Sequence, residues 1–111
     1  MAFELQVGPL SFSPKRTNER LVYAFDFKNV LATGEIIASG VWNAYAVNPT
    51  TASVFNMIVG SPTIMSGSII MQQVQGGTGD CLYELVCRVY TTSNNIIEEN
   101  ALLKVTDSAY V

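Results

Sequence analysis

Histidine is absent from this sequence, and the chain has only two cysteines. Histidine is the side chain most often used as a general base, as the activating partner of a serine or cysteine nucleophile, and as a metal ligand. Two cysteines alone cannot supply the four ligands of a structural zinc site. The composition therefore predicts a protein that is not an enzyme and that has no catalytic residue, no metal site and no cofactor.

Charge and long apolar segments are also scarce. Charged residues make up 14% of the chain and the net charge is only −3, which is too small an imbalance to indicate nucleic acid or an anionic membrane as the partner. The longest apolar stretch, residues 36–42, contains Ser39 and Gly40 and is far shorter than the roughly 20 residues of a membrane helix. No basic segment followed by an apolar stretch opens the chain, so we expect no signal peptide and no membrane span.

What the chain does have is an apolar composition for its 111 residues, of which 49% are hydrophobic, with a mean hydropathy of +0.27. This length suits a single domain with its own hydrophobic core. A surplus of apolar residues in so small a protein predicts that part of the surface contacts another protein.

Residues 1–19 differ from the rest of the chain. They contain Pro9, Pro14 and a polar run at their end, with only a short apolar alternation before it. Segments of this kind are commonly ordered by a partner. We therefore predict an N-terminal arm over residues 1–19 that does not complete the core, followed by a folded domain over residues 20–111.

Three of the six basic residues, Lys15, Arg16 and Arg20, lie together in the arm and just after it. Clustered basic side chains can steer docking onto an acidic protein surface. These three residues are therefore the predicted partner-binding residues. A solvated segment without a binding role is the alternative interpretation.

Alternation of apolar and polar residues predicts β-strands along the rest of the chain. The expected strands cover residues 20–27, 35–47, 54–59, 63–74, 81–92 and 96–105, with a bulge or bend at Gly67 and a strand end at Ser61-Pro62. Short strands with turn signals about every ten residues predict an all-β fold, an antiparallel β-sandwich or jelly roll with an extended N-terminal arm.

The same alternation predicts which side chains form the core. The expected core residues are Tyr23, Phe25, Phe27, Trp42, Tyr83, Leu85 and Val89, and Ile36, Ala38, Gly40, Trp42 and Ala44 are expected to share one face. Pairing with the preceding strand favours a strand over residues 96–105. A helix over residues 97–105 is the alternative, because its glutamate, alanine, leucine and lysine residues favour helices.

Cys81 and Cys87 lie six residues apart in one predicted strand. That spacing places them on the same face and roughly 20 Å apart, which is too far for a disulfide between them. We therefore predict two free thiols.

Two groups of motifs resemble a known group of proteins. They are Tyr-Ala-Phe-Asp-Phe at 23–27 followed by Leu-Ala-Thr-Gly-Glu-Ile-Ile at 31–37, and Gly-Gly-Thr-Gly at 76–79 followed by Tyr83, Val89 and Thr-Thr-Ser at 91–93. These motifs resemble small accessory virion proteins of tailed phages, over about residues 23–105. The size and the N-terminal arm are most similar to the capsid staple protein of epsilon-fifteen-like short-tailed phages.

The resemblance implies an immunoglobulin-type or jelly-roll domain that serves as a capsid decoration protein. Such a staple, or cement protein, is made in the host cytoplasm, binds the outer surface of the assembled shell as a homodimer, and bridges subunits of the major capsid protein. A fibre-tail adaptor of the virion is the alternative within the same group. A carbohydrate-binding β-sandwich module, with Trp42 and tyrosines as its platform, is the alternative from another class. The resemblance supplies no catalytic residue.

Overall fold

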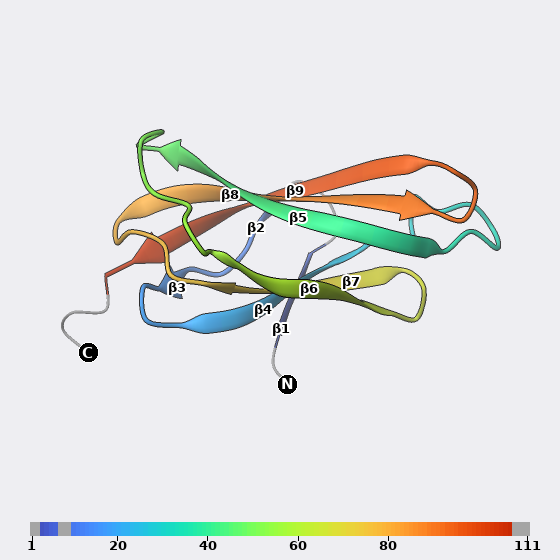
Figure 1. Ribbon diagram of the computed structural model, residues 1–111, viewed down its shortest axis with the longest axis horizontal. Helices are drawn as coiled ribbons and strands as arrows, with labels where there is room; N and C mark the ends of the chain where they lie inside the picture. The colour runs from blue at the N-terminus through green and yellow to red at the C-terminus, as the bar shows by residue number, and fades with distance from the viewer. Residues whose placement is uncertain (1–2, 7–9, 108–111) are drawn as a thin grey trace.

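The chain forms two packed β-sheets (Figure 1), described by a computed structural model for residues 3–6 and 10–107. One sheet has the order β1 (Phe3–Gln6), β4 (Arg20–Asp26), β7 (Ile69–Gln75) and β6 (Ile58–Met65). The other has the order β2 (Leu10–Ser11), β9 (Ile96–Thr106), β8 (Cys81–Thr91) and β5 (Ile37–Asn48), and β3 (Lys15–Arg16) also pairs with β9. The described residues contain no helix. The predicted all-β sandwich is confirmed.

The strand order identifies the type of sandwich. β4, β7 and β6 pair antiparallel in one sheet, and β9, β8 and β5 pair antiparallel in the other. This is the order of strands B, E, D and G, F, C in constant-type immunoglobulin domains. The order therefore favours the immunoglobulin-type sandwich over the jelly roll. The N-terminal strands differ from the others in their pairing, because β1 runs parallel to β4, and β2 and β3 run parallel to β9.

The N-terminal segment contributes to the core. Phe12 is 3% exposed, and its ring centroid lies 4.7 Å from that of Tyr23 and 5.4 Å from that of Phe25. The expectation that residues 1–19 leave the core complete without them is therefore wrong for Phe12. The physical reason is that β2 and β3 both pair with β9. The residues between these two strands, which include Phe12, therefore lie along the five-stranded sheet, where the Phe12 side chain packs into the core.

Side chains from both sheets fill the space between them. Trp42 on β5 stacks on Phe25 on β4, with ring centroids 5.0 Å apart and an interplanar angle of 25°. All seven predicted core residues are buried. The core consists of Phe12, Tyr23, Phe25, Phe27, Ile37, Trp42, Met57, Ile70, Val74, Cys81, Tyr83, Leu85, Cys87, Val89, Ala101, Leu103 and Val105.

Strand β9 and the two cysteines match their predictions. Residues 96–105 pair with β8 in an unbroken antiparallel register, so the predicted strand is confirmed and the alternative helix is wrong. Cys81 and Cys87 are free, buried thiols on the inner face of β8. Burial raises the pKa of the Cys87 thiol, and the nearby Glu99 carboxylate acts in the same direction.

Two strand predictions were wrong in detail. Ser61 and Pro62 lie inside β6, and the chain reverses instead at Ser66 and Gly67, which have φ angles of 56° and 73°. Two successive positive φ angles are typical of the tight turns that join twisted hairpin strands. In β5, a register shift between Ile37 and Ser39 turns the strand by one residue, so Ile37 is buried in place of the predicted Ile36.

Candidate protein-binding surfaces

Lys15 is not available to a partner in the folded protein. Its side chain is fully buried, and Nζ donates hydrogen bonds of 2.6 Å to the carbonyl oxygens of Arg16 and Gly76. Burial lowers the pKa of Lys15, while the nearby Glu19 carboxylate raises it. Lys15 therefore joins the N-terminal segment to the turn after β7.

Arg16 and Arg20 remain exposed. Arg20 donates to the side-chain oxygen of Gln75 through Nε at 3.0 Å and Nη2 at 2.6 Å, which holds its guanidinium beside β7. The backbone N–H of Arg16 donates to the Glu19 carboxylate at 2.7 Å. The structure therefore does not bring the three predicted residues into one exposed basic cluster, and a partner-binding role stays a prediction for Arg16 and Arg20.

Exposed apolar side chains mark one end of the elongated molecule, which measures 48 × 29 × 22 Å. This end consists of the β8–β9 hairpin and the loop between β4 and β5, on the right in Figure 1. Val30, Ile36 and Ile96 are exposed there, and Ile96 has 65% of its surface accessible. We call these three residues the hairpin end.

A buried carboxylate fixes the two segments of the hairpin end. Glu35 accepts hydrogen bonds from the Thr91 hydroxyl, from the Ala32 N–H at 2.9 Å and from the Asn95 side-chain amide at 2.8 Å. These bonds, that from Thr91 above all, lower the pKa of Glu35, so the carboxylate is charged at neutral pH. The Glu35 contacts join the loop to the hairpin and hold the exposed side chains in a fixed arrangement.

The opposite end is formed by the loop between β5 and β6, on the left in Figure 1. Phe55 is 81% exposed, and the neighbouring Val54 is also exposed. The loop is anchored beneath them because the Tyr83 hydroxyl donates to the Ser53 carbonyl at 3.0 Å and accepts from the Thr78 N–H at 2.8 Å. We call Val54 and Phe55 the loop end. An exposed phenylalanine on an anchored loop is a suitable anchor for a protein partner.

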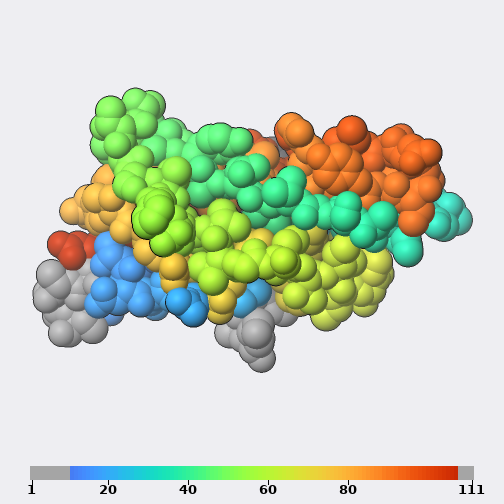
Figure 2. Space-filling view, in the orientation of Figure 1, coloured from blue at the N-terminus to red at the C-terminus, as the bar shows by residue number. Residues whose placement is uncertain are grey.

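A long continuous run of the chain carries no charge. Residues 36–79 contain no aspartate, glutamate, lysine or arginine, so all six basic and nine acidic residues lie outside this run. The run covers β5, β6, β7 and their connections, and its green and yellow side chains occupy much of the surface seen in Figure 2. Its large exposed apolar residues are Ile36, Val41, Tyr45, Val47, Val54, Phe55 and Met65. Sequence reasoning missed this surface, although the uncharged run was a signal that could have found it.

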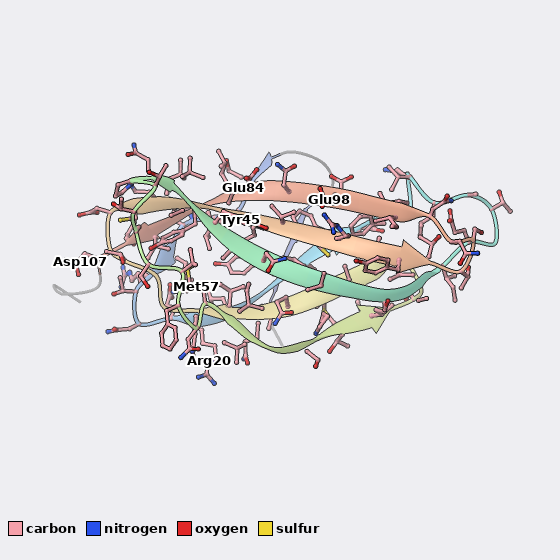
Figure 3. All side chains as sticks on the ribbon, turned by 45° about the horizontal axis from the view of Figure 1, so that its top comes forward. Arg20, Tyr45, Met57, Glu84, Glu98 and Asp107 are labelled. Atoms are coloured by element: carbon pink, nitrogen blue, oxygen red, sulfur yellow. The ribbon has the colours of Figure 1, made fainter. Side chains whose placement is uncertain are left out.

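Charged side chains are present on β8 and β9, the strands that lie next to β5 in the order of the five-stranded sheet. Figure 3 shows Tyr45 with Glu84 on β8, the strand beside β5, and Glu98 on β9, the next strand of the sheet. The Arg88 guanidinium lies 2.7 Å from the Glu98 carboxylate, and the Asn100 amide donates to Glu84. The boundary between the charged and uncharged parts of this face therefore runs between β5 and β8.

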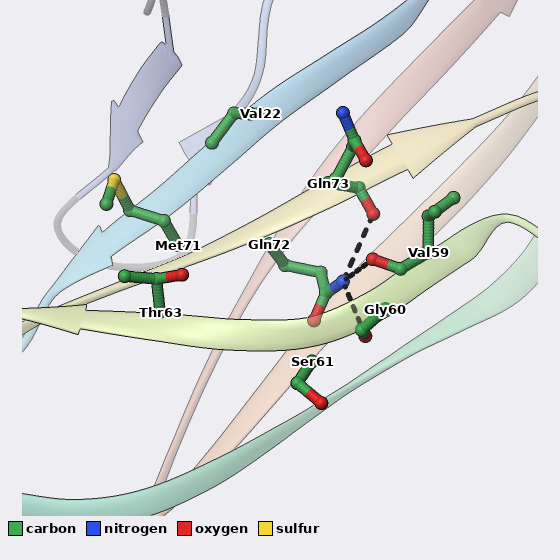
Figure 4. A pocket seen from close by; sticks show the side chains of 8 residues that line it. All are labelled: Val22, Val59, Gly60, Ser61, Thr63, Met71, Gln72 and Gln73. Atoms are coloured by element: carbon green, nitrogen blue, oxygen red, sulfur yellow. Dashed lines mark hydrogen bonds between the residues drawn. The ribbon is translucent and has the colours of Figure 1, made fainter.

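A hollow on the outer face of the four-stranded sheet has a structural explanation. It has a volume of about 280 Å³ and lies where the pairing of β6 with β7 is shifted between Val59 and Thr63. Figure 4 shows the Gln72 amide nitrogen donating to the carbonyls of Val59, at 2.7 Å, and Gly60, at 3.2 Å. Gln72 thus stabilises the irregular part of β6. The volume lies below the roughly 300–1,000 Å³ of common small-molecule sites.

The carbohydrate-binding alternative loses its main residue. Trp42 is buried, with its ring stacked on Phe25. A platform for sugars requires an exposed aromatic face, so Trp42 cannot serve as one.

Among the described residues, no group of three or more acidic or cysteine residues could hold a metal ion, and no helix is long and apolar enough to cross a membrane.

Comparison with protein families decides the group to which the chain is related. The family described as podophage GP4 fiber-tail adaptor protein gp77 matches residues 15–104. The chain belongs to this family. A search of curated proteins gave no significant match.

Membership of the gp77 family shows that the chain is a small accessory protein of a phage virion, as the resemblance of its motifs implied. The match begins at β3 and ends within β9, so it contains both apolar ends and the whole uncharged run. Its description agrees with the fibre-tail adaptor alternative rather than with the capsid staple.

Proposed function

We propose that this gp77-family protein is a fibre-tail adaptor, which binds a tail protein through one surface and a fibre protein through another. The observation that carries the proposal is the family match over residues 15–104. The role is binding rather than catalysis. This replaces capsid decoration, the function ranked first from the sequence, and its partner, the major capsid protein.

The shape and the distribution of apolar residues support a bridging role. The hairpin end and the loop end lie at opposite ends of an axis of 48 Å. A rigid sandwich with an apolar contact at each end can hold two partners at a fixed separation. Two modest contacts are sufficient when many adaptors act in one particle, because each bound adaptor raises the effective concentration of the next contact.

The number of copies in a purified virion tests the proposal against decoration. A tail occupies one vertex of the shell, so an adaptor should be present in a number set by the rotational symmetry of the tail. A decoration protein should be present in a number that follows the capsid subunits. Quantitative mass spectrometry against the major capsid protein gives this ratio. A copy number proportional to the whole shell would contradict the adaptor function.

Loss of the protein gives a second test. Particles made without this chain should have intact shells and tails but no attached fibres, and the purified protein should restore fibre attachment when added back. Fibres that attach normally without it would contradict the proposal. Shells that become fragile while fibres stay attached would favour decoration.

A further inference from the structure

The edge of the five-stranded sheet at β5 is open. Within the described residues, β5 pairs with β8 on one side and with no strand on the other. From Ser39 to Ala46 its register with β8 is unbroken. The exposed backbone groups of such an edge can pair with another strand.

Between its two register shifts, from Ser39 to Ala46, β5 lacks the features that normally protect an edge strand. Charged residues, especially lysine, and prolines discourage pairing at an edge, and Ile37–Asn48 contains neither. The edge strand of the other sheet, β6, differs in this respect. It contains Pro62 and Gly60, with a φ angle of 71° at Gly60, and its pairing is shifted between Val59 and Thr63. The β6 edge is therefore interrupted in its middle, whereas the β5 edge is regular from Ser39 to Ala46.

The side chains around the open edge are apolar or neutral. On the outer face of the sheet, Val41, Tyr45 and Val47 are exposed, and Asn43 lies among them. The uncharged run extends from β5 across β6. A strand that pairs here would therefore lie beside a strand without charged residues, and the nearest charges of the sheet, Arg88 and Glu84, lie opposite Val41 and Tyr45 on β8, on the side of β5 away from the open edge.

The lack of charge favours a second copy of this chain as the occupant. In a dimer with two-fold symmetry, each residue near the axis lies close to its own copy, so any charge there would face a like charge. β5 itself contains no charged residue, so none would lie on the two-fold axis of a β5–β5 pair. A charged partner strand would bury charges without a counterion in the interface, which is costly.

We propose that two copies of this chain pair antiparallel through their β5 strands and form one continuous sheet across the dimer. This proposal leaves the hairpin end and the loop end of both copies free, so the dimer can bind each virion partner twice. It does not depend on which virion proteins those partners are.

Sedimentation equilibrium across a range of protein concentrations tests the proposal. The wild-type protein should have twice the mass of the 12.1 kDa chain, and Val41→Lys should have the mass of one chain while its far-UV circular dichroism and cooperative unfolding are retained. Asn43→Lys provides a second variant if Val41→Lys fails to fold. Ile96→Lys is the matched control, since it introduces the same charge at an exposed apolar position of the same sheet, and it should remain dimeric.

Cysteine crosslinking locates the contact. Residues directly opposite in an antiparallel pair have Cβ atoms about 4.5–5.5 Å apart, so one of Val41→Cys, Asn43→Cys and Tyr45→Cys should form an intermolecular disulfide on mild oxidation, whereas Ile96→Cys should not. A monomeric wild type at every concentration would overturn the proposal. So would a dimer that survives both lysine substitutions in β5. Neither result bears on the copy number in the virion, which tests the adaptor function separately.

Discussion

At the scale of single residues, Lys15 shows where an interpretation from local sequence fails. Its neighbours in sequence, Arg16 and Arg20, suggested one exposed basic cluster. In the folded protein Lys15 is buried, and its Nζ donates to the carbonyl oxygen of Gly76, which lies 61 residues away in the chain. A lysine stem can cover apolar surface wherever the fold provides it, and local sequence does not report such a distant contact.

The contacts of Lys15 predict a stabilising role. Lys15→Ala should lower the free energy of unfolding by about 1–3 kcal/mol, because it leaves two part-buried carbonyl groups without their donor. Arg16→Ala is the matched control, and an exposed substitution of this kind should change stability by less than about 0.5 kcal/mol. Urea denaturation followed by tryptophan fluorescence measures both. Equal stability of the two variants would show that Lys15 is solvated.

Gly77 is a second residue whose identity the fold requires. Its φ angle is 90°, and a Cβ atom at this position would lie 2.9 Å from Cγ2 of Val105. Gly76 also has a positive φ, of 66°, but no atom lies within 4 Å of its Cβ position. Gly76→Ala should cost about 1–2 kcal/mol from backbone strain alone, and Gly77→Ala should cost more. Thermal unfolding of the two variants side by side tests this order, and the reverse order would show that crowding by Val105 does not determine the cost.

At the scale of elements, most strands could be predicted because burial alternates along them. Strand β8 is the clearest case, since Cys81, Tyr83, Leu85, Cys87 and Val89 are all buried as their spacing indicates. The failures occur where the backbone departs from a regular pleat. The shift after Ile37 and the passage of β6 through Pro62 depend on how the partner strand is placed. Alternation in one strand contains no information on that placement.

The Glu35 contacts that fix the hairpin end predict a dependence of stability on pH. The folded protein holds the pKa of Glu35 below its ordinary value of 4.5, so this carboxylate contributes stability that is fully present at neutral pH and is lost as the pH falls below 4.5. Glu35→Gln should therefore be less stable than the wild type at pH 7, and the difference should shrink at pH 3. Denaturation at the two pH values measures it. Glu98→Gln, in an exposed ion pair, is the control and should show a smaller difference at pH 7.

At the scale of the whole molecule, the distribution of charge separates the surfaces. The acidic and basic residues are confined to residues outside 36–79. The uncharged β5 edge within this run suits self-association, and the exposed apolar side chains at the two ends suit virion partners. The fold class followed from the sequence because it depends on the pattern of the whole chain. The binding surfaces did not, since they combine residues from strands and loops that only the fold brings together.

The final prediction concerns the two ends as separate binding sites. Phe55→Ser and Ile96→Ser each remove an exposed apolar side chain without disturbing the core, so neither should lower the melting temperature. If each end holds one partner, Phe55→Ser should weaken binding to only one of the two, the isolated fibre or the fibre-free tail, and Ile96→Ser should weaken binding to the other. A central apolar anchor is worth about 2 kcal/mol or more, which corresponds to a roughly 30-fold loss of affinity.

Surface plasmon resonance with both partners and both variants gives four affinities. Thr63→Ala, at an exposed position within β6, should leave binding to both partners unchanged. Two variants that weaken the same partner equally would show that the ends form one site, and the molecule would then not bridge along its long axis.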